Sequence, residues 1–243
     1  MIQRLTAAIA ATSPMVLMLS QSAFFITLWL SLRRHVSIHG PIPGARTLTT
    51  INSWFYALVS LGLFLITISP SHDLLARRLY HASKFYEYVD ILNVLASGGE
   101  IDLHFGVHHL TTMYLTYARV LHHSEGWRIF AALNTAHHVL MYAFFGGATW
   151  VRPALPWTGA VQLLVGIATD FWVGKGKIGR GEEVWPNFVG GGILMTYFVL
   201  FLRDLELRRR ERQEKKKRPE YLKRCRGALI SHRKSVADYE RRR

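Results

Sequence analysis

Polar side chains interrupt the apolar segments of this chain at three places, and the first group is charged. Lys84, Glu87 and Asp90 stand at positions i, i+3 and i+6, so a helix would carry an ammonium and two carboxylates on one stripe. An ionisable group at the centre of a membrane span costs about 2.5–3.5 kcal/mol or more, so such groups face the interior of a bundle. We expect either a charge network beside a site or an interfacial salt bridge at a helix start.

Histidines form the second group. His104 and His108 share one face of a helix, and His109 lies about 100° around the helix from His108. Neutral imidazole titrates near pH ~6.5, so these side chains can act as base, acid or nucleophile near neutrality. Interhelical hydrogen bonds would also explain histidines within a span, but an adjacent pair favours chemistry.

The third group combines amide, imidazole and phenol side chains on one helical face. Its members, spaced i, i+4, i+7, i+8 and i+11, are Asn134, His138, Met141, Tyr142 and Phe145. A packed apolar stripe explains Met141 and Phe145. It does not explain why Asn134, His138 and Tyr142 share that face, so we expect these three to line a site. His137 points elsewhere and is expected to be structural.

Seven segments are apolar enough to position these groups inside a membrane, since a span needs about 20 mainly apolar residues. They are Leu5–Leu32, Leu48–Ser69, Phe85–Ala96, Leu103–Val120, Ile129–Phe145, Leu155–Val173 and Phe188–Leu202. The first is too long for a signal peptide and lacks a small-residue cleavage site, so we expect a retained span. The third and fourth are the least apolar, which leaves six spans as an alternative. The sequence predicts an all-α polytopic membrane helix bundle of about seven transmembrane helices.

Charge is concentrated after the last apolar segment. Residues 203–243 hold 17 Lys and Arg and seven Asp and Glu, which is +10 of the formal net charge of +14. We expect a transmembrane domain at residues 1–203 and a basic tail at residues 204–243. Because the basic block adjoins an apolar segment, its expected polyanion is a lipid bilayer surface, at about 1 kcal/mol per charge, and not nucleic acid. The single cysteine, Cys225, excludes a disulfide framework and cysteine-based zinc sites.

The distribution of Lys and Arg predicts the orientation, because cytoplasmic loops are enriched in both. The basic tail is therefore expected in the cytoplasm, and Arg33, Arg34 and Arg46 place the first loop on the same side. Basic residues within 77–84 and 174–180 oppose this orientation. His122 and His123 fall in a loop on the other side of the membrane, where we expect a surface role and no chemistry.

Three blocks, in this order, resemble the ELO family of very-long-chain fatty acid elongases. Ser83-Lys-Phe-Tyr-Glu-Tyr-Val-Asp90 is similar to the family's Ser-Lys-x-x-Glu-x-x-Asp stretch, and Val107-His-His109 is similar to the end of its His-x-x-His-His box. The block that begins at Asn134 is similar to its Asn-x-x-x-His-x-x-Met-Tyr-x-Tyr-Tyr stretch. The likeness covers residues 48–202.

The family pattern is altered at its histidine box. The first box histidine would fall at Phe105, and a histidine stands one position earlier, at His104, so the box reads His-x-x-x-His-His. Gln162 falls where a glutamine-rich helix is expected, and Val165 stands at the second glutamine of that helix. These departures indicate a divergent member or one that has lost the reaction.

The resemblance implies a reaction, a compartment and partners. Members of the family are endoplasmic-reticulum 3-ketoacyl-CoA synthases with seven spans, which join malonyl-CoA to a fatty acyl-CoA and release CO2 and CoA. The implied fold encloses a narrow acyl tunnel, and the implied substrates are CoA thioesters, with no metal and no other cofactor. Other enzymes of the elongation cycle and a second copy of the chain are candidate partners.

Carried over by position, the resemblance gives each polar group a role. His108 would be the nucleophile that forms an acyl-imidazole, and His138 would steer malonyl decarboxylation or stabilise the enolate. Asn134 and Tyr142 would hold a thioester oxygen, and His109 would orient the site. The supporting or substrate-binding residues would be Lys84, Glu87, Asp90, His104, Met141 and Gln162.

Other functions fit parts of the pattern. The altered box also fits a catalytically impaired elongase-like scaffold or lipid-binding membrane protein. The many histidines would allow a di-iron desaturase or hydroxylase, but that class keeps its histidines in cytoplasmic loops, and His122 and His123 are predicted on the opposite side. A receptor or channel would leave the stripe of Asn134, His138 and Tyr142 unexplained.

Overall fold

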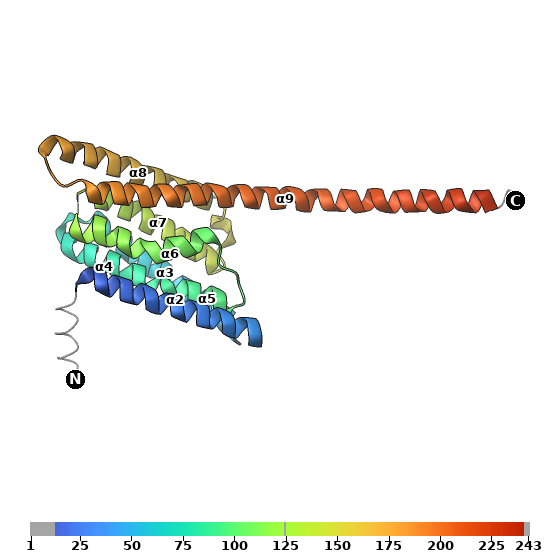
Figure 1. The fold of residues 1–243 in the computed structure, drawn as a ribbon, viewed down its shortest axis with the longest axis horizontal. Helices are drawn as coiled ribbons and strands as arrows, with labels where there is room; N and C mark the ends of the chain where they lie inside the picture. The colour runs from blue at the N-terminus through green and yellow to red at the C-terminus, as the bar shows by residue number, and fades with distance from the viewer. Residues whose placement is uncertain (1–12, 124, 241–243) are drawn as a thin grey trace. The chain divides into compact units, whose positions relative to one another are not determined.

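The computed structural model describes residues 13–123 and 125–240, with side chains described as far as residue 215. Every regular element in these ranges is a helix, which confirms the predicted all-α membrane helix bundle (Figure 1). The chain forms two compact units, one that ends at Leu200 and one that begins at Phe201.

The first two described helices are joined by a short connection with two glycines. α2 (Pro14–His39) continues past the predicted end at Leu32, because Gly40, with φ of 82°, is the first residue that interrupts it. α3 (Ala45–Ile68) starts directly after Gly44, whose φ is 79°. Residues 5–12 of the predicted first span lie outside the described residues.

Two consecutive helices stand where the sequence predicted the third span. α4 (Asp73–Tyr86) begins well before the predicted start at Phe85, and α5 (Tyr88–Ala96) follows it with Glu87 between them. At this break the Tyr56 hydroxyl donates to the Ser83 carbonyl at 2.9 Å, so a side chain from α3 enters the helical hydrogen-bond ladder. Counting α4 and α5 as one rod, the described residues form the predicted seven rods.

α6 (Leu103–Thr116) and α7 (Trp127–Phe145) carry the predicted histidine and Asn/His/Tyr groups. Asp102 caps α6, where its carboxylate accepts from the Phe105 amide at 2.7 Å. α6 continues into η2 (Tyr117–His122), a π-helical turn, so the path ends two residues beyond the predicted Val120. Irregular turns of this kind are frequent at functional sites.

The last two helices are longer than predicted. α8 (Leu155–Arg180) passes through residues 174–180, where the sequence suggested a loop, and ends at Gly181 with φ of 70°. α9 (Trp185–Glu240) contains the predicted seventh span in its first part. Within the unit that ends at Leu200, α7 packs against both α3 and α8, and α2 packs against α5.

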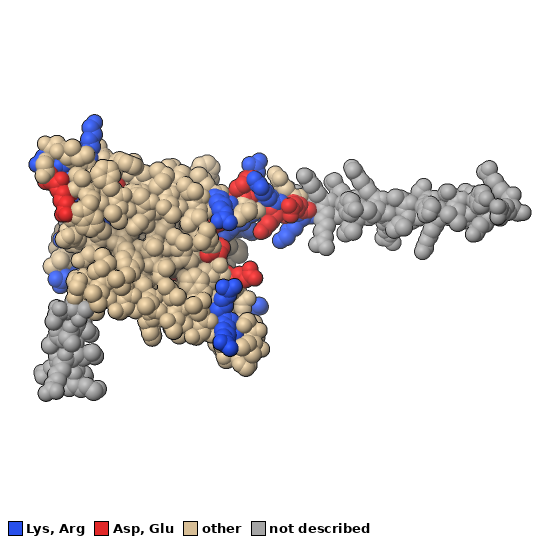
Figure 2. All heavy atoms as spheres, viewed as in Figure 1, with Lys and Arg blue, Asp and Glu red and all other residues tan. Residues whose placement is uncertain are grey.

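Three described helices are long and apolar enough to cross a membrane, judged by length and composition. They are Pro14–His39, Ala45–Ile68 and Trp185–Lys215. Large apolar side chains also cover the outside of the bundle, where Phe24, Leu58 and Trp172 are 70%, 68% and 75% exposed. On the face drawn in Figure 2, few charged atoms lie on the middle of the bundle. A soluble domain rarely exposes so large an apolar surface, which is typical of a membrane protein. The polar groups of the less apolar helices therefore lie inside a membrane protein.

Candidate active site

The structure brings three predicted residues from three elements into one cluster. His108 lies on α6, His138 on α7, and Glu87 at the break between α4 and α5. One nitrogen of each imidazole and one carboxylate oxygen lie within 4.8 Å of one another. Glu87 is 0% exposed and His138 is 4% exposed. We call Glu87, His108 and His138 the buried trio.

An ion pair anchors the carboxylate of the buried trio. Lys84 Nζ donates to Glu87 Oε1 at 2.7 Å, and both side chains are at most 2% exposed. The same oxygen accepts from the Tyr56 hydroxyl at 3.1 Å and lies 3.3 Å from His138 Nδ1. Glu87 Oε2 is buried and has no hydrogen-bond partner among the described residues. A buried carboxylate oxygen without a hydrogen bond destabilises the fold. Glu87 Oε2 is therefore the oxygen that can accept a hydrogen bond from a proton donor.

Asn134 joins the buried trio to two further helices. Its Oδ1 accepts from Lys84 Nζ and from the Tyr80 hydroxyl, each at 2.9 Å. Its Nδ2 donates to Gln162 Oε1 on α8 at 3.0 Å and lies 3.4 Å from His138 Nε2. Asn134 therefore fixes the position of both the ammonium and one histidine, and Gln162 belongs to the network despite its weak signal in the sequence.

Asp90 does not continue the charge stripe that the sequence suggested. Because the helix breaks at Glu87, the Asp90 carboxylate turns to a separate network, where it accepts from the Tyr142 hydroxyl and from Asn52 Nδ2, the latter at 3.2 Å. Asn52 Oδ1 in turn accepts from the Tyr86 hydroxyl at 2.5 Å. The phenol predicted to hold a thioester oxygen is thus already engaged with a carboxylate.

The remaining predicted site residues surround the buried trio at varying distances. His109 is buried, and its Nδ1 has no hydrogen-bond partner among the described residues. His104 is half-buried, with its ring centroid 6.1 Å from that of His108. Met141 packs against the cluster formed by Tyr56, Ala57 and Tyr142. His104 and His109 thus lie on either side of His108 on α6, whereas Met141 contributes packing.

The buried trio offers a carboxylate and two imidazoles, a donor set that could hold a divalent metal or serve acid–base and nucleophilic chemistry. A metal ion would have to compete with the Lys84 ammonium for the same Glu87 oxygen. Two cations beside one buried carboxylate repel strongly in a medium of low dielectric constant. The arrangement therefore suits proton and group transfer better than metal binding.

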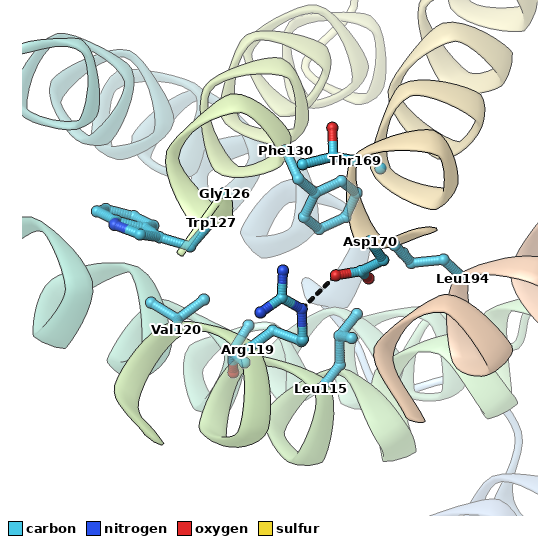
Figure 3. A pocket seen from close by; sticks show the side chains of 11 residues that line it. Leu115, Arg119, Val120, Gly126, Trp127, Phe130, Thr169, Asp170 and Leu194 are labelled. Carbon is cyan, nitrogen blue, oxygen red and sulfur yellow. Dashed lines mark hydrogen bonds and ion pairs between the residues drawn. The ribbon is translucent and has the colours of Figure 1, made fainter. Parts of the chain in front are cut away.

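Several polar partners could not be found from the sequence. Tyr56 and Tyr80 are single tyrosines in apolar helices, where packing is the ordinary explanation. Arg119 on η2 and Asp170 on α8 form a second buried ion pair, which lines the pocket in Figure 3. They stand 51 residues apart, so no local spacing links them.

The comparison with known families agrees with this geometry. A profile of the ELO, GNS1/SUR4 family matches residues 70–206, which contain the ion pair, the histidine box, the Asn134 block and Gln162. The chain belongs to this family, whose members act in fatty acid elongation. No curated protein and no solved structure matches the chain significantly.

Proposed function

We propose that the protein is a fatty acid elongase. It would condense malonyl-CoA with a long-chain fatty acyl-CoA to 3-ketoacyl-CoA and release CO2 and CoA. The observation that carries the proposal is the buried trio: two imidazoles from neighbouring helices face one carboxylate inside a water-poor bundle, in a chain of the ELO family.

In the first half of the reaction, an imidazole nitrogen of His108 attacks the thioester carbonyl of the acyl-CoA. A C–N bond forms, the C–S bond breaks, and CoA leaves as a thiol after it takes up the imidazole proton. Splitting the condensation in this way replaces one difficult step by two easier ones. The free Glu87 Oε2 is the group that supports transient positive charge on His108 and His138.

In the second half, malonyl-CoA enters and loses CO2, and the electron pair of the broken C–C bond becomes an enolate. The enolate carbon attacks the acyl carbon and the C–N bond to His108 breaks. The released His108 nitrogen takes up one proton from solvent, which restores the neutral imidazole. His138 is the enolate stabiliser, because Asn134 and Glu87 both hold its ring in place. Fixed donors aimed at developing charge are most effective where water is excluded.

The surroundings fit a substrate with an apolar chain and an anionic head. A bundle in the membrane supplies an apolar tunnel for the acyl chain, and the basic segment after residue 202 attracts the phosphates of CoA. We place the protein in the endoplasmic reticulum membrane, with the C-terminus in the cytoplasm. Other enzymes of the elongation cycle and a second copy of the chain remain its proposed partners. No additional cofactor is required by these steps.

The test incubates purified protein with acyl-CoA and with malonyl-CoA, and the label is at carbon 2 of the malonyl group. We expect label in 3-ketoacyl-CoA and release of one CoA per product, both lost in His108→Ala and retained in His39→Asn, an exposed histidine at the end of α2. Normal product formation by the His108→Ala protein would contradict the proposal.

The altered histidine box keeps a second function open, that of an elongase-like lipid-binding scaffold. Phe105 packs against the His109 ring with centroids 4.4 Å apart, so the first box position is filled by apolar packing. Acyl-CoA binding without any release of CoA, in the same experiment, would favour the scaffold over the elongase.

A further inference from the structure

A second group of two histidines and a glutamate lies at the end of the bundle where η2 ends and where α8 connects to α9. His122 is the last residue of η2, His123 follows it, and Glu183 lies between α8 and α9. One ligand atom from each lies within 4.8 Å of the others. We call these residues the terminal trio. The sequence predicted a surface role and no chemistry for its two histidines, because they fall in a loop. Glu183 is 60 positions beyond His123, so no local spacing links them.

The spacing within the terminal trio fits a small divalent cation. His123 Nε2 and Glu183 Oε2 lie 3.3 Å apart. In a tetrahedral zinc site with bonds of about 2.1 Å, the ligand atoms are about 3.4 Å from one another. Two imidazoles and one carboxylate are also a donor set that zinc uses where a fourth position stays open to water.

One ligand atom of the terminal trio has a carboxylate neighbour but no hydrogen bond. His123 Nε2 is buried and has no hydrogen bond within residues 13–123 and 125–240, although its ring carries the nitrogen that faces Glu183. A buried polar atom without a hydrogen bond costs about 1–3 kcal/mol and calls for an explanation. A coordinated cation would satisfy this nitrogen and Glu183 together.

Neighbouring groups hold two of the three ligands in place. The Trp185 indole N–H donates to Glu183 Oε1, the carboxylate oxygen that does not face His123. Arg119 Nη1 donates to the His123 carbonyl at 3.2 Å, and Asp170 fixes the same guanidinium, as Figure 3 shows. Partners of this kind orient the ligands of most metal sites. The buried Arg119–Asp170 pair thus positions the histidine loop, which explains why two charges are buried there.

We propose that the terminal trio is a Zn²⁺ site that ties the end of η2 to the connection between α8 and α9. Water completes the coordination. The charge of Lys177 lies close to His123, so we expect an affinity below that of a closed four-ligand site. The proposal does not depend on the elongase reaction, since none of its ligands belongs to the buried trio.

The experiment measures Zn²⁺ bound to the purified full chain after dialysis against buffered zinc. We expect one equivalent per chain, and a rise in the unfolding temperature when zinc is added. Glu183→Gln keeps the side-chain shape and removes the anionic ligand, so it should lower the affinity at least ten-fold. Trp185→Phe removes only the hydrogen bond to Glu183 and should lower it about ten-fold.

Two control variants test whether histidines outside the terminal trio hold the metal. The double variant His35→Asn/His39→Asn removes an exposed pair on α2 whose rings lie 4.7 Å apart, and it should keep the bound zinc. His138→Asn tests the buried trio and should also keep it. Loss of the zinc in either control, or its retention in Glu183→Gln, overturns the proposal, and so does the absence of zinc from the unmutated chain.

Discussion

The buried trio and the terminal trio have the same composition, two imidazoles and one carboxylate within 4.8 Å, but different surroundings. Glu87 is 0% exposed and paired with Lys84, whereas the Glu183 side chain is 56% exposed. In the buried trio the carboxylate already has its cation, and the histidines are left for group transfer. In the terminal trio no Lys or Arg side chain of residues 13–123 and 125–215 forms an ion pair with Glu183, and a metal ion can take that place.

Residue type and spacing alone therefore do not decide the chemistry of a histidine cluster. What decides it is whether a permanent cation occupies the carboxylate and whether water reaches the site. Changes that remove the surroundings of one trio should therefore have effects that the same change in the other does not have.

The largest effect is expected from the histidine opposite the nucleophile. His138→Ala removes the imidazole that Glu87 and Asn134 hold, and we expect the rate of 3-ketoacyl-CoA formation to fall by about 10²–10⁴-fold. The matched control is His137→Ala, because that ring contacts Thr158 and points away from the trio. Equal losses in the two variants would show that the fall reflects general damage to α7.

The next effect concerns the free energy of unfolding, to which the two carboxylates, Glu87 and Glu183, contribute differently. Lys84→Met leaves Glu87 buried without its cation and should lower the free energy of unfolding by about 3–5 kcal/mol. The double variant Lys84→Met/Glu87→Gln should recover most of the loss. Glu183→Gln, measured without metal, should change it by less than about 0.5 kcal/mol. Thermal unfolding in detergent measures the stability of all three variants. A large loss of stability in Glu183→Gln would contradict the stated difference between the two trios.

A smaller effect is expected at Gln162, which touches neither histidine. Gln162→Ala removes the acceptor of the Asn134 amide, a neutral hydrogen bond of about 0.5–1.5 kcal/mol, so the rate should fall by at most about ten-fold. Gln162→Glu restores an acceptor of the same shape and should recover part of the rate. An unchanged rate in Gln162→Ala would remove α8 from the account of the site.

The smallest effect distinguishes the end of the bundle from its centre by pH. Burial raises the pKa of Asp73, but the hydrogen bond from Arg128 and the charges of Arg77 and Arg128 together lower it below its ordinary value. A carboxyl group with a lowered folded-state pKa stabilises the fold above its unfolded-state pKa and loses this contribution as pH falls through the folded-state value. Asp73→Asn should therefore be slightly less stable than the unmutated protein at pH ~7, with a difference that disappears in acid. A difference that grows in acid would contradict this sign.

The sequence predicted the helix class and the residues that meet in the buried trio, because buried polar groups at helical spacing stand out against apolar spans. It did not predict the helix break at Glu87, where the Tyr56 hydroxyl from another helix contacts the Ser83 carbonyl. It placed Asp90 on one stripe with Lys84 and Glu87 but did not predict that the Asp90 carboxylate accepts from Tyr142 and Asn52. The extension of α8 was missed because the Gly and Lys residues within 174–179 are tolerated inside a helix. The extension of α2 was missed because Arg33 and Arg34 end an apolar segment but do not end a helix.

Partners that are distant along the chain were the other limit. Asn134 and Gln162 were each found, but the bond between them could not be, and neither could the link from Arg119 through the His123 loop to the terminal trio. These contacts depend on the order in which helices pack, which a single sequence with lone polar residues does not encode in any local pattern.

The measurement that tests the account most directly is the mass of the protein after incubation with a long-chain acyl-CoA alone. We predict one acyl group per chain on a peptide that contains His108, an equal amount of free CoA, and loss of the acyl group when malonyl-CoA is added. An acyl group on another residue, or CoA release without any covalent acyl group, would contradict the role of His108 in the buried trio.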